Sequence, residues 1–110
     1  MKNDKKIIFI DIDETICDHP KTNPGEPRDY NKAIPIIENI EKANKLYDKG
    51  HTIVYWTARG SVTGLDWTDL TNKQLNSWGV KYHEIRLGKP YYDIFIDDKA
   101  LNVSDWVWDG

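Results

Sequence analysis

Cysteine is nearly absent from this chain of 110 residues, in which Cys17 is the single cysteine. A disulfide framework within the chain is therefore excluded, and a reducing compartment is favoured. Long apolar runs are missing too: no stretch approaches the ~20 residues that span a bilayer. The polar start at residues 1–6 is unlike a signal peptide. We expect a cytoplasmic protein that has no membrane partner.

An excess of basic charge is also missing. The chain has 18 acidic and 15 basic residues, which gives a formal net charge of −3. A general nucleic-acid binder is normally basic, so the composition argues against a nucleic-acid partner. It does not exclude a binder that has a local basic patch. Hydrophobic residues at 39% and charged residues at 30% are typical of a folded globular chain. The length predicts a single domain over residues 1–110.

Strand and helix patterns alternate along the chain. Strand-like runs cover 7–10, 52–56, 80–85 and 92–96, and helical periodicity covers 34–49 and 67–78. In the second helix, Thr71 and Gln74 have the spacing of a capping box. The alternation predicts parallel strands joined by right-handed crossovers. We therefore expect an α/β fold, a three-layer α/β/α sandwich with a mostly parallel, Rossmann-like sheet.

The segment between the first strand and the first helix is rich in helix-breaking residues. Three prolines and a glycine fall within residues 18–28, and neither a helix nor a central strand tolerates that density. Residues 17–30 are a candidate flap over a neighbouring site, and His19 within it could contact a substrate. The sequence leaves open whether this flap closes as a lid.

Chemically active residues follow the predicted strands. In an open parallel sheet, ligands bind beyond the carboxyl ends of the strands. Converging carboxylates tolerate one another best around Mg²⁺, and carboxylates, a hydroxyl and a lysine around that ion suit phosphoryl transfer. A carboxylate can then attack phosphorus and form an aspartyl-phosphate. The residues placed at these strand ends are Asp11, Asp13, Thr57, Ala58, Arg59, Lys89, Asp97 and Asp98.

Four of these motifs resemble the signatures of the haloacid dehalogenase (HAD) superfamily of phosphohydrolases. Asp11-Ile12-Asp13-Glu14-Thr15 is similar to the DxDxT/V signature, and Thr57, Lys89 and the pair Asp97-Asp98 match the other three in order. More narrowly, the segments at 57–59, 88–90 and 95–100 resemble short bacterial members that are labelled capsule or surface-polysaccharide biosynthesis phosphatases.

The resemblance implies a role for each residue. Asp11 would be the nucleophile and a Mg²⁺ ligand. Asp13 would protonate the leaving oxygen, later activate water, and give the metal its backbone carbonyl. Thr57 and Lys89 would hold the phosphoryl oxygens.

Two assignments stay open at this point. Either residue of the acidic pair could bind the metal directly, and alignment of the apolar strand residues favours Asp98 over Asp97. Arg59, expected at the rim beside Ala58, either binds a second anionic group of the substrate or forms a surface ion pair.

The resemblance implies a Mg²⁺-dependent phosphomonoesterase for a small phosphorylated metabolite, with a sugar or polyol phosphate first. The segments between the motifs are too short for a cap domain, so the site should be open unless the flap or a second copy in a homo-oligomer covers it. The alternatives are a phosphatase for a nucleic-acid end or a phosphoprotein, a phosphotransferase, and a non-catalytic regulatory module that binds phosphate or Mg²⁺. The intact Asp11 and Asp13 argue against the last.

Overall fold

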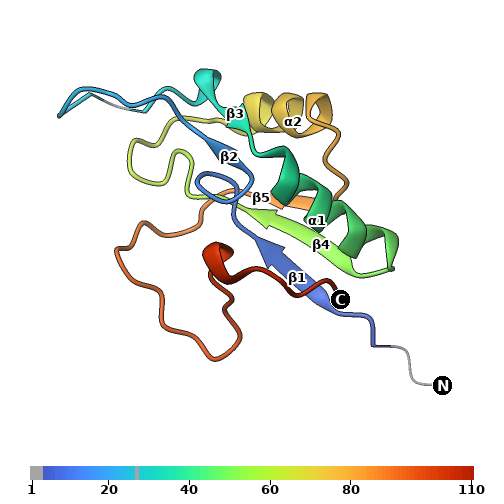
Figure 1. The fold of residues 1–110 in the computed structure, drawn as a ribbon. Coiled ribbons are helices and arrows are strands. Elements are labelled where there is room, and N and C mark those ends of the chain that lie inside the picture. The colour runs from blue at the N-terminus through green and yellow to red at the C-terminus, as the bar shows by residue number, and fades with distance from the viewer. Residues whose placement is uncertain (1–3, 27) are drawn as a thin grey trace.

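The computed structural model describes residues 4–26 and 28–110 (Figure 1). Its centre is a parallel sheet of three strands in the order β1 (Ile7–Ile10), β4 (Thr52–Trp56) and β5 (Glu84–Arg86). Two helices connect them, α1 (Ile37–Asp48) and α2 (Thr68–Ser77). The predicted strands at 7–10 and 52–56 and both predicted helices are confirmed, and the third predicted strand is shorter than expected.

Both helices cover the same face of the sheet (Figure 1). Each crossover steps one strand in the same direction, and right-handed crossovers of that kind place their helices on one side. The core between them is apolar, with Ile10, Ile53 and Tyr55 packed with Ile40, Leu46 and Leu75. The expected α/β domain with a parallel sheet is therefore observed. The described residues form two layers, and a third layer is not confirmed.

The flap lies between two short strands. The antiparallel pair β2 (Cys17–Asp18) and β3 (Ile34–Pro35) closes its base, and the 3-10 helix η1 (Tyr30–Lys32) lies within it. Within the predicted flap at 17–30, residues 19–26, 28 and 29 form a loop that projects from the domain in Figure 1; Pro27 lies outside the described residues. The first helix begins later than residue 34, because Ile34 and Pro35 pair with β2.

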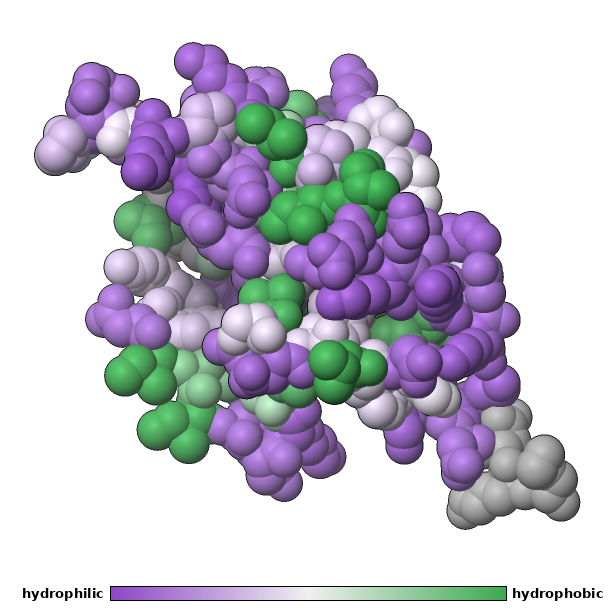
Figure 2. Space-filling model, viewed as in Figure 1, coloured by the Kyte–Doolittle hydropathy of each residue, from purple (hydrophilic) through white to green (hydrophobic). Residues whose placement is uncertain are grey.

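The fourth predicted strand is not formed, so the prediction for 92–96 is wrong. The segment is a loop whose side chains face solvent, with Ile94 78% and Ile96 93% exposed. Figure 2 shows hydrophobic groups at the lower left of the molecule, where this loop runs in Figure 1. Apolar and β-branched residues favour a strand because their side chains pack well on a pleated, half-buried surface. A strand also needs a hydrogen-bonding neighbour, and the described residues give this segment none.

The C-terminal tail packs against α1. After the 3-10 helix η2 (Val103–Asp105), Trp106 is buried, and its carbonyl accepts a hydrogen bond of 2.9 Å from Lys42 Nζ. Trp108 then packs on His51. Among the described residues, no helix combines the length and apolar character needed to cross a membrane.

One buried polar group in the core has no partner. The hydroxyl of Tyr55 makes no hydrogen bond among the described residues, and burial raises the pKa of this phenol. An unpaired buried hydroxyl costs stability. Tyr55→Phe should therefore leave the free energy of unfolding unchanged or raise it by up to about 1 kcal/mol, as measured by urea titration.

Tyr82→Phe is the matched control, because the Tyr82 hydroxyl donates to Asn76 at 3.1 Å. Loss of this hydrogen bond in Tyr82→Phe should lower the free energy of unfolding by about 0.5–1 kcal/mol. A loss of more than about 1 kcal/mol in Tyr55→Phe would mean that the Tyr55 hydroxyl has a partner, such as a buried water.

Candidate functional site

The turn after β1 sets two carboxylates on one side of the chain. Ile12 and Ile16 are fully buried, and the Ile16 N–H donates to the Ile12 carbonyl at 2.9 Å, which closes the turn. Glu14 has φ +68°, the left-handed conformation that non-glycine residues rarely adopt. With Ile12 anchored in the core, Asp11 and Asp13 on either side of it both line one cleft.

Lys89 reaches the same place from the end of β5. The Thr57 N–H donates to the Arg86 carbonyl at 2.9 Å, and the Lys89 N–H donates to the Thr57 carbonyl at 3.1 Å. These bonds continue the pairing of β4 and β5 past the ends of the strands. They bring Lys89 Nζ to 3.5 Å from Asp11 Oδ1.

The cleft has a volume of about 270 Å³ and is open to solvent. Five of the predicted site residues line it, namely Asp11, Asp13, Ala58, Arg59 and Lys89. Thr57 lies behind them, fully buried, and its hydroxyl accepts the Arg59 N–H at 3.1 Å. Flap and loop side chains complete the lining: Glu14, Arg28, Tyr30, Pro90, Tyr91 and Tyr92.

The acidic pair is not part of this cleft. Asp97 and Asp98 are exposed in the loop after β5 and do not line it, and Asp97 Oδ2 accepts the Lys99 N–H at 3.0 Å. The prediction that they meet Asp11 depended on a fourth strand at 92–96. Because that segment is a loop, the described structure does not bring them to Asp11.

Arg59 differs most from its prediction. It is only 1% exposed, so the expected position at the rim is wrong, and so is the surface ion pair. Its Nη2 lies 2.9 Å from Asp13 Oδ1 and its Nε lies 3.1 Å from Asp13 Oδ2. Its Nη1 donates to Thr71 Oγ1 at 3.1 Å and to Gln74 Oε1 at 2.6 Å. The guanidinium thus connects Asp13 to α2.

Thr71 and Gln74 are the functional residues whose role the sequence analysis missed. They lie inside α2, which begins at Thr68, so they do not form a capping box. Both are buried. The available signal was their position: two polar residues three apart on the inner stripe of an amphipathic helix need buried partners.

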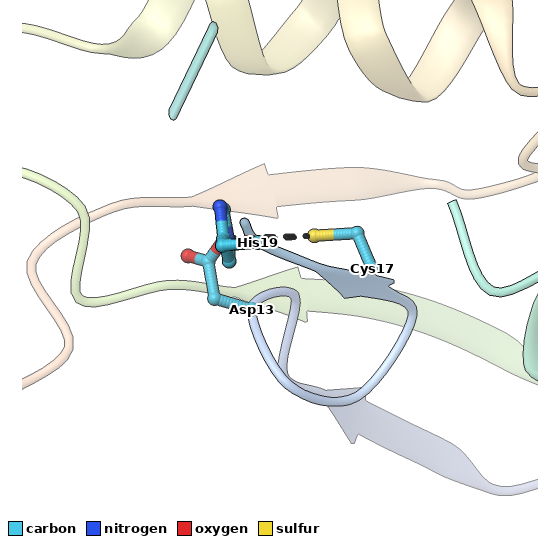
Figure 3. Close-up of side chains that lie close together, drawn as sticks. All are labelled: Asp13, Cys17 and His19. Carbon is cyan, nitrogen blue, oxygen red and sulfur yellow. Dashed lines mark hydrogen bonds and ion pairs between the residues drawn. The ribbon is translucent and has the colours of Figure 1, made fainter. Parts of the chain in front are cut away.

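Asp13, Cys17 and His19 form a compact cluster at the base of the flap (Figure 3). His19 Nε2 lies 2.7 Å from Asp13 Oδ1, and Cys17 Sγ lies 3.5 Å from the same oxygen. Metal binding requires a thiolate, yet burial, with the charge of Asp13, raises the pKa of Cys17 to about 12. Arg59 also donates hydrogen bonds to both oxygens of Asp13, which a metal would need as ligands. The cluster is therefore a hydrogen-bonded network, and it gives no support to Mg²⁺, which prefers oxygen ligands.

The two carboxylates of the cleft differ in proton affinity. Burial raises the pKa of Asp11, and the charge of Lys89 offsets only part of that effect. Burial on its own would raise the pKa of Asp13 as well, but the hydrogen bonds and charge of Arg59, helped by His19, lower it below its usual value. The surroundings of Asp13 thus favour its charged form, whereas those of Asp11 disfavour it.

The charges of the cleft cancel in pairs. Three carboxylates and three cations line it. Arg59 contacts Asp13, Lys89 approaches Asp11, and Arg28 forms an ion pair with Glu14. A phosphate dianion entering the cleft would therefore meet no excess of positive charge from these side chains.

Comparison with solved structures finds the same fold elsewhere. A crystal structure of an MCSG target from Vibrio cholerae is similar to this chain with a TM-score of 0.75 and 27% identity, over 91% of this chain and 85% of that one. No family model matches the chain, and no curated protein does. The similarity supports the small α/β fold and assigns no chemistry to the cleft.

The raised pKa of Asp11 predicts a stabilising substitution. A group with a raised folded-state pKa contributes stability below its unfolded pKa, and this contribution is lost as the pH rises through the folded pKa. At pH 7, Asp11→Asn should therefore be more stable than the native chain. The gain should be below about 1 kcal/mol, because the Asp11 side chain is 37% exposed and solvent screens its charge.

The gain should disappear as the pH falls below about 4, where the carboxyl group is protonated in both states. Asp48→Asn, at an exposed position paired with Lys81, is the control and should change stability by less than about 0.5 kcal/mol. Urea titrations at several pH values test both. A stability loss in Asp11→Asn at pH 7 would contradict the assignment of an under-compensated charge.

Proposed function

We propose that the protein is a Mg²⁺-dependent phosphomonoesterase of the HAD superfamily, of the short type without a cap domain, which forms an aspartyl-phosphate on Asp11. One observation carries the proposal. Asp11, with Lys89 Nζ at 3.5 Å, shares an open cleft with a second carboxylate two residues further along the chain. A nucleophile, a charge-neutralising lysine and a proton-transfer group are the parts that such a reaction requires.

In the proposed first step, an Asp11 oxygen forms a bond to phosphorus while the bond to the leaving oxygen breaks. Asp13, whose lowered pKa favours the carboxylate form, takes up the proton of the entering phosphate monoanion and passes it to that oxygen. In the second step, Asp13 takes a proton from water, whose oxygen bonds to phosphorus as the bond to Asp11 breaks. Lys89 holds a phosphoryl oxygen throughout, and Ala58 lines the phosphate site, with Thr57 buried behind it.

Two features of the cleft support a hard cation at Asp11. This carboxylate has a raised pKa because its burial is not fully compensated, and the cleft has no net charge with which to attract a phosphate. We propose that Asp11, the backbone carbonyl of Asp13 and one of Asp98 and Asp97 hold Mg²⁺. The described loop leaves the last of these ligands away from the cleft. Bound Mg²⁺ would supply the positive charge that offsets the developing charge on the phosphoryl oxygens.

Two observations support the proposed third layer of the fold and the proposed cytoplasmic location. The outer face of the sheet exposes Ile7 and Phe9, which is the surface that the third layer of a sandwich would cover. The single thiol, Cys17, is free and buried, which is compatible with a reducing, cytoplasmic location.

The proposed substrate is a small phosphorylated metabolite, and a sugar or polyol phosphate is the first candidate. A cleft of about 270 Å³ suits a small molecule, and Tyr91 and Tyr92 offer aromatic faces at its edge. The second candidate is a phosphatase for a nucleic-acid end or a phosphoprotein. It is favoured by the open cleft and by the 65% exposure of Tyr91. A second copy of the chain over the cleft would favour the small substrate.

Phosphate release from sugar phosphates, nucleotides, phosphopeptides and 3′-phosphorylated oligonucleotides tests the function. We expect turnover of one class with Mg²⁺, none with EDTA, and a loss of at least about 10³-fold in Asp11→Asn, since no nucleophile remains. Lys81→Met, at an exposed position, should keep full activity. Folded, Mg²⁺-loaded protein that binds these ligands and releases no phosphate would favour the regulatory module instead.

The acidic pair gives a separate prediction. Asp98→Asn should weaken the apparent affinity for Mg²⁺ by about 10- to 100-fold, and Asp97→Asn should weaken it less, as expected for a residue that supports the ligand. Activity measured across a Mg²⁺ titration compares the two variants. Equal Mg²⁺ dependence in both variants and the native chain would show that the loop does not contribute to the metal site.

A further inference from the structure

Arg59 has no donor left for a substrate. A guanidinium carries five N–H groups. Nε–H and one N–H of Nη2 point to Asp13, and both N–H groups of Nη1 go to α2 through Thr71 and Gln74. The remaining N–H of Nη2 points to Cys17 Sγ at 3.9 Å. One face of the guanidinium is covered as well, because Arg59 Cζ lies 4.7 Å from the centre of the Tyr30 ring.

The base of the flap is tied to the same group. His19 contacts Asp13, and Gln74 Nε2 donates to the Tyr30 carbonyl at 2.6 Å. The Arg59 backbone is fixed by its hydrogen bond to Thr57. Four segments of the chain, the turn after β1, the flap, the end of β4 and α2, therefore meet at one carboxylate.

The two oxygens of Asp13 are occupied unequally. Oδ1 accepts from His19 Nε2 at 2.7 Å and from Arg59 Nη2 at 2.9 Å, and the Cys17 thiol lies 3.5 Å away. A carboxylate oxygen has about two acceptor sites, so Oδ1 is saturated. Oδ2 accepts only from Arg59 Nε, at 3.1 Å, and shares this N–H with Oδ1, which lies 3.3 Å from Nε. Figure 3 shows one Asp13 oxygen turned toward His19 and the other turned away from it.

We propose that Arg59 is a positioning residue, anchored on α2 by Thr71 and Gln74, that holds Asp13 so that Oδ2 exchanges the proton in the reaction. This inference rests on the proposed function and deepens it. The proton leaves Oδ2 for the leaving oxygen as the P–O bond breaks, and Oδ2 takes the proton of the attacking water in the second step. Arg59 itself does not touch the substrate.

The effect of the leaving group separates positioning from the other roles of an arginine. A nitrophenolate leaves readily without a proton, whereas an alkoxide does not. A misplaced proton donor therefore lowers kcat/KM for an alkyl phosphate and spares an aryl phosphate. Loss of a substrate contact, or loss of folded protein, lowers kcat/KM for both by the same factor.

The test compares kcat/KM for 4-nitrophenyl phosphate and for the best alkyl phosphate of the panel. In Arg59→Lys, which keeps the charge and loses the fork, the alkyl-to-aryl ratio should fall by about 10- to 100-fold. In Thr71→Val, which keeps the shape and loses one bond to Nη1, it should fall by about twofold to fivefold. Arg86→Met, which removes an exposed guanidinium paired with Glu84, should leave the ratio unchanged.

Asp13→Asn completes a double-mutant cycle. Once the proton-transfer group is gone, adding Arg59→Lys should change the ratio by less than about twofold, because the two residues act as a unit. An unchanged ratio in Arg59→Lys, with kcat/KM lowered equally for both substrates, would overturn the positioning role. Native protein without turnover of either phosphate would overturn the proposed function, and this inference with it.

Discussion

The buried ion pair between Arg59 and Asp13 is the interaction on which the site depends. Both groups lose most of their hydration, and such a pair is tolerated only where the remaining donors and acceptors are also paired. Here Thr71 and Gln74 on α2 accept both N–H groups of Arg59 Nη1, and His19 in the flap contacts Asp13. The pair thus fixes how the helix, the flap and the turn after β1 sit relative to one another.

The same pair makes the two carboxylates of the cleft unlike. Asp13 is surrounded by donors and has a lowered pKa, whereas Asp11 is partly buried beside one lysine and has a raised pKa. Neighbouring carboxylates whose environments push their pKa values apart are suited to different roles in one reaction. Asp11 is the less stabilised of the two anions. The lowered pKa of Asp13 arises first from Arg59 and then from His19.

The sequence predicted local features well and the long-range arrangement of α2 and the loop poorly. Strand ends and polar residues after them are visible in the chain, so Asp11, Asp13 and Lys89 were expected together and do line one cleft. The partners of Arg59 were not foreseen, because a polar pair within a helix stripe does not say which residue it binds. The strand at 92–96 was predicted from composition, and composition does not provide the neighbour that a strand requires. Asp97 and Asp98 were misplaced for the same reason.

The pairwise cancellation of charge has a consequence for any phosphate ligand. Each cation of the cleft already faces a carboxylate, so a dianion could bind only by displacing an internal pair or by arriving with added positive charge. Displacing Arg59 would leave Asp13 buried and uncompensated, which is the costlier change. Lys89, 3.5 Å from Asp11, is the cation most easily shared. If a phosphate bound between Lys89 and a cation held by Asp11, every charge of the cleft would stay paired.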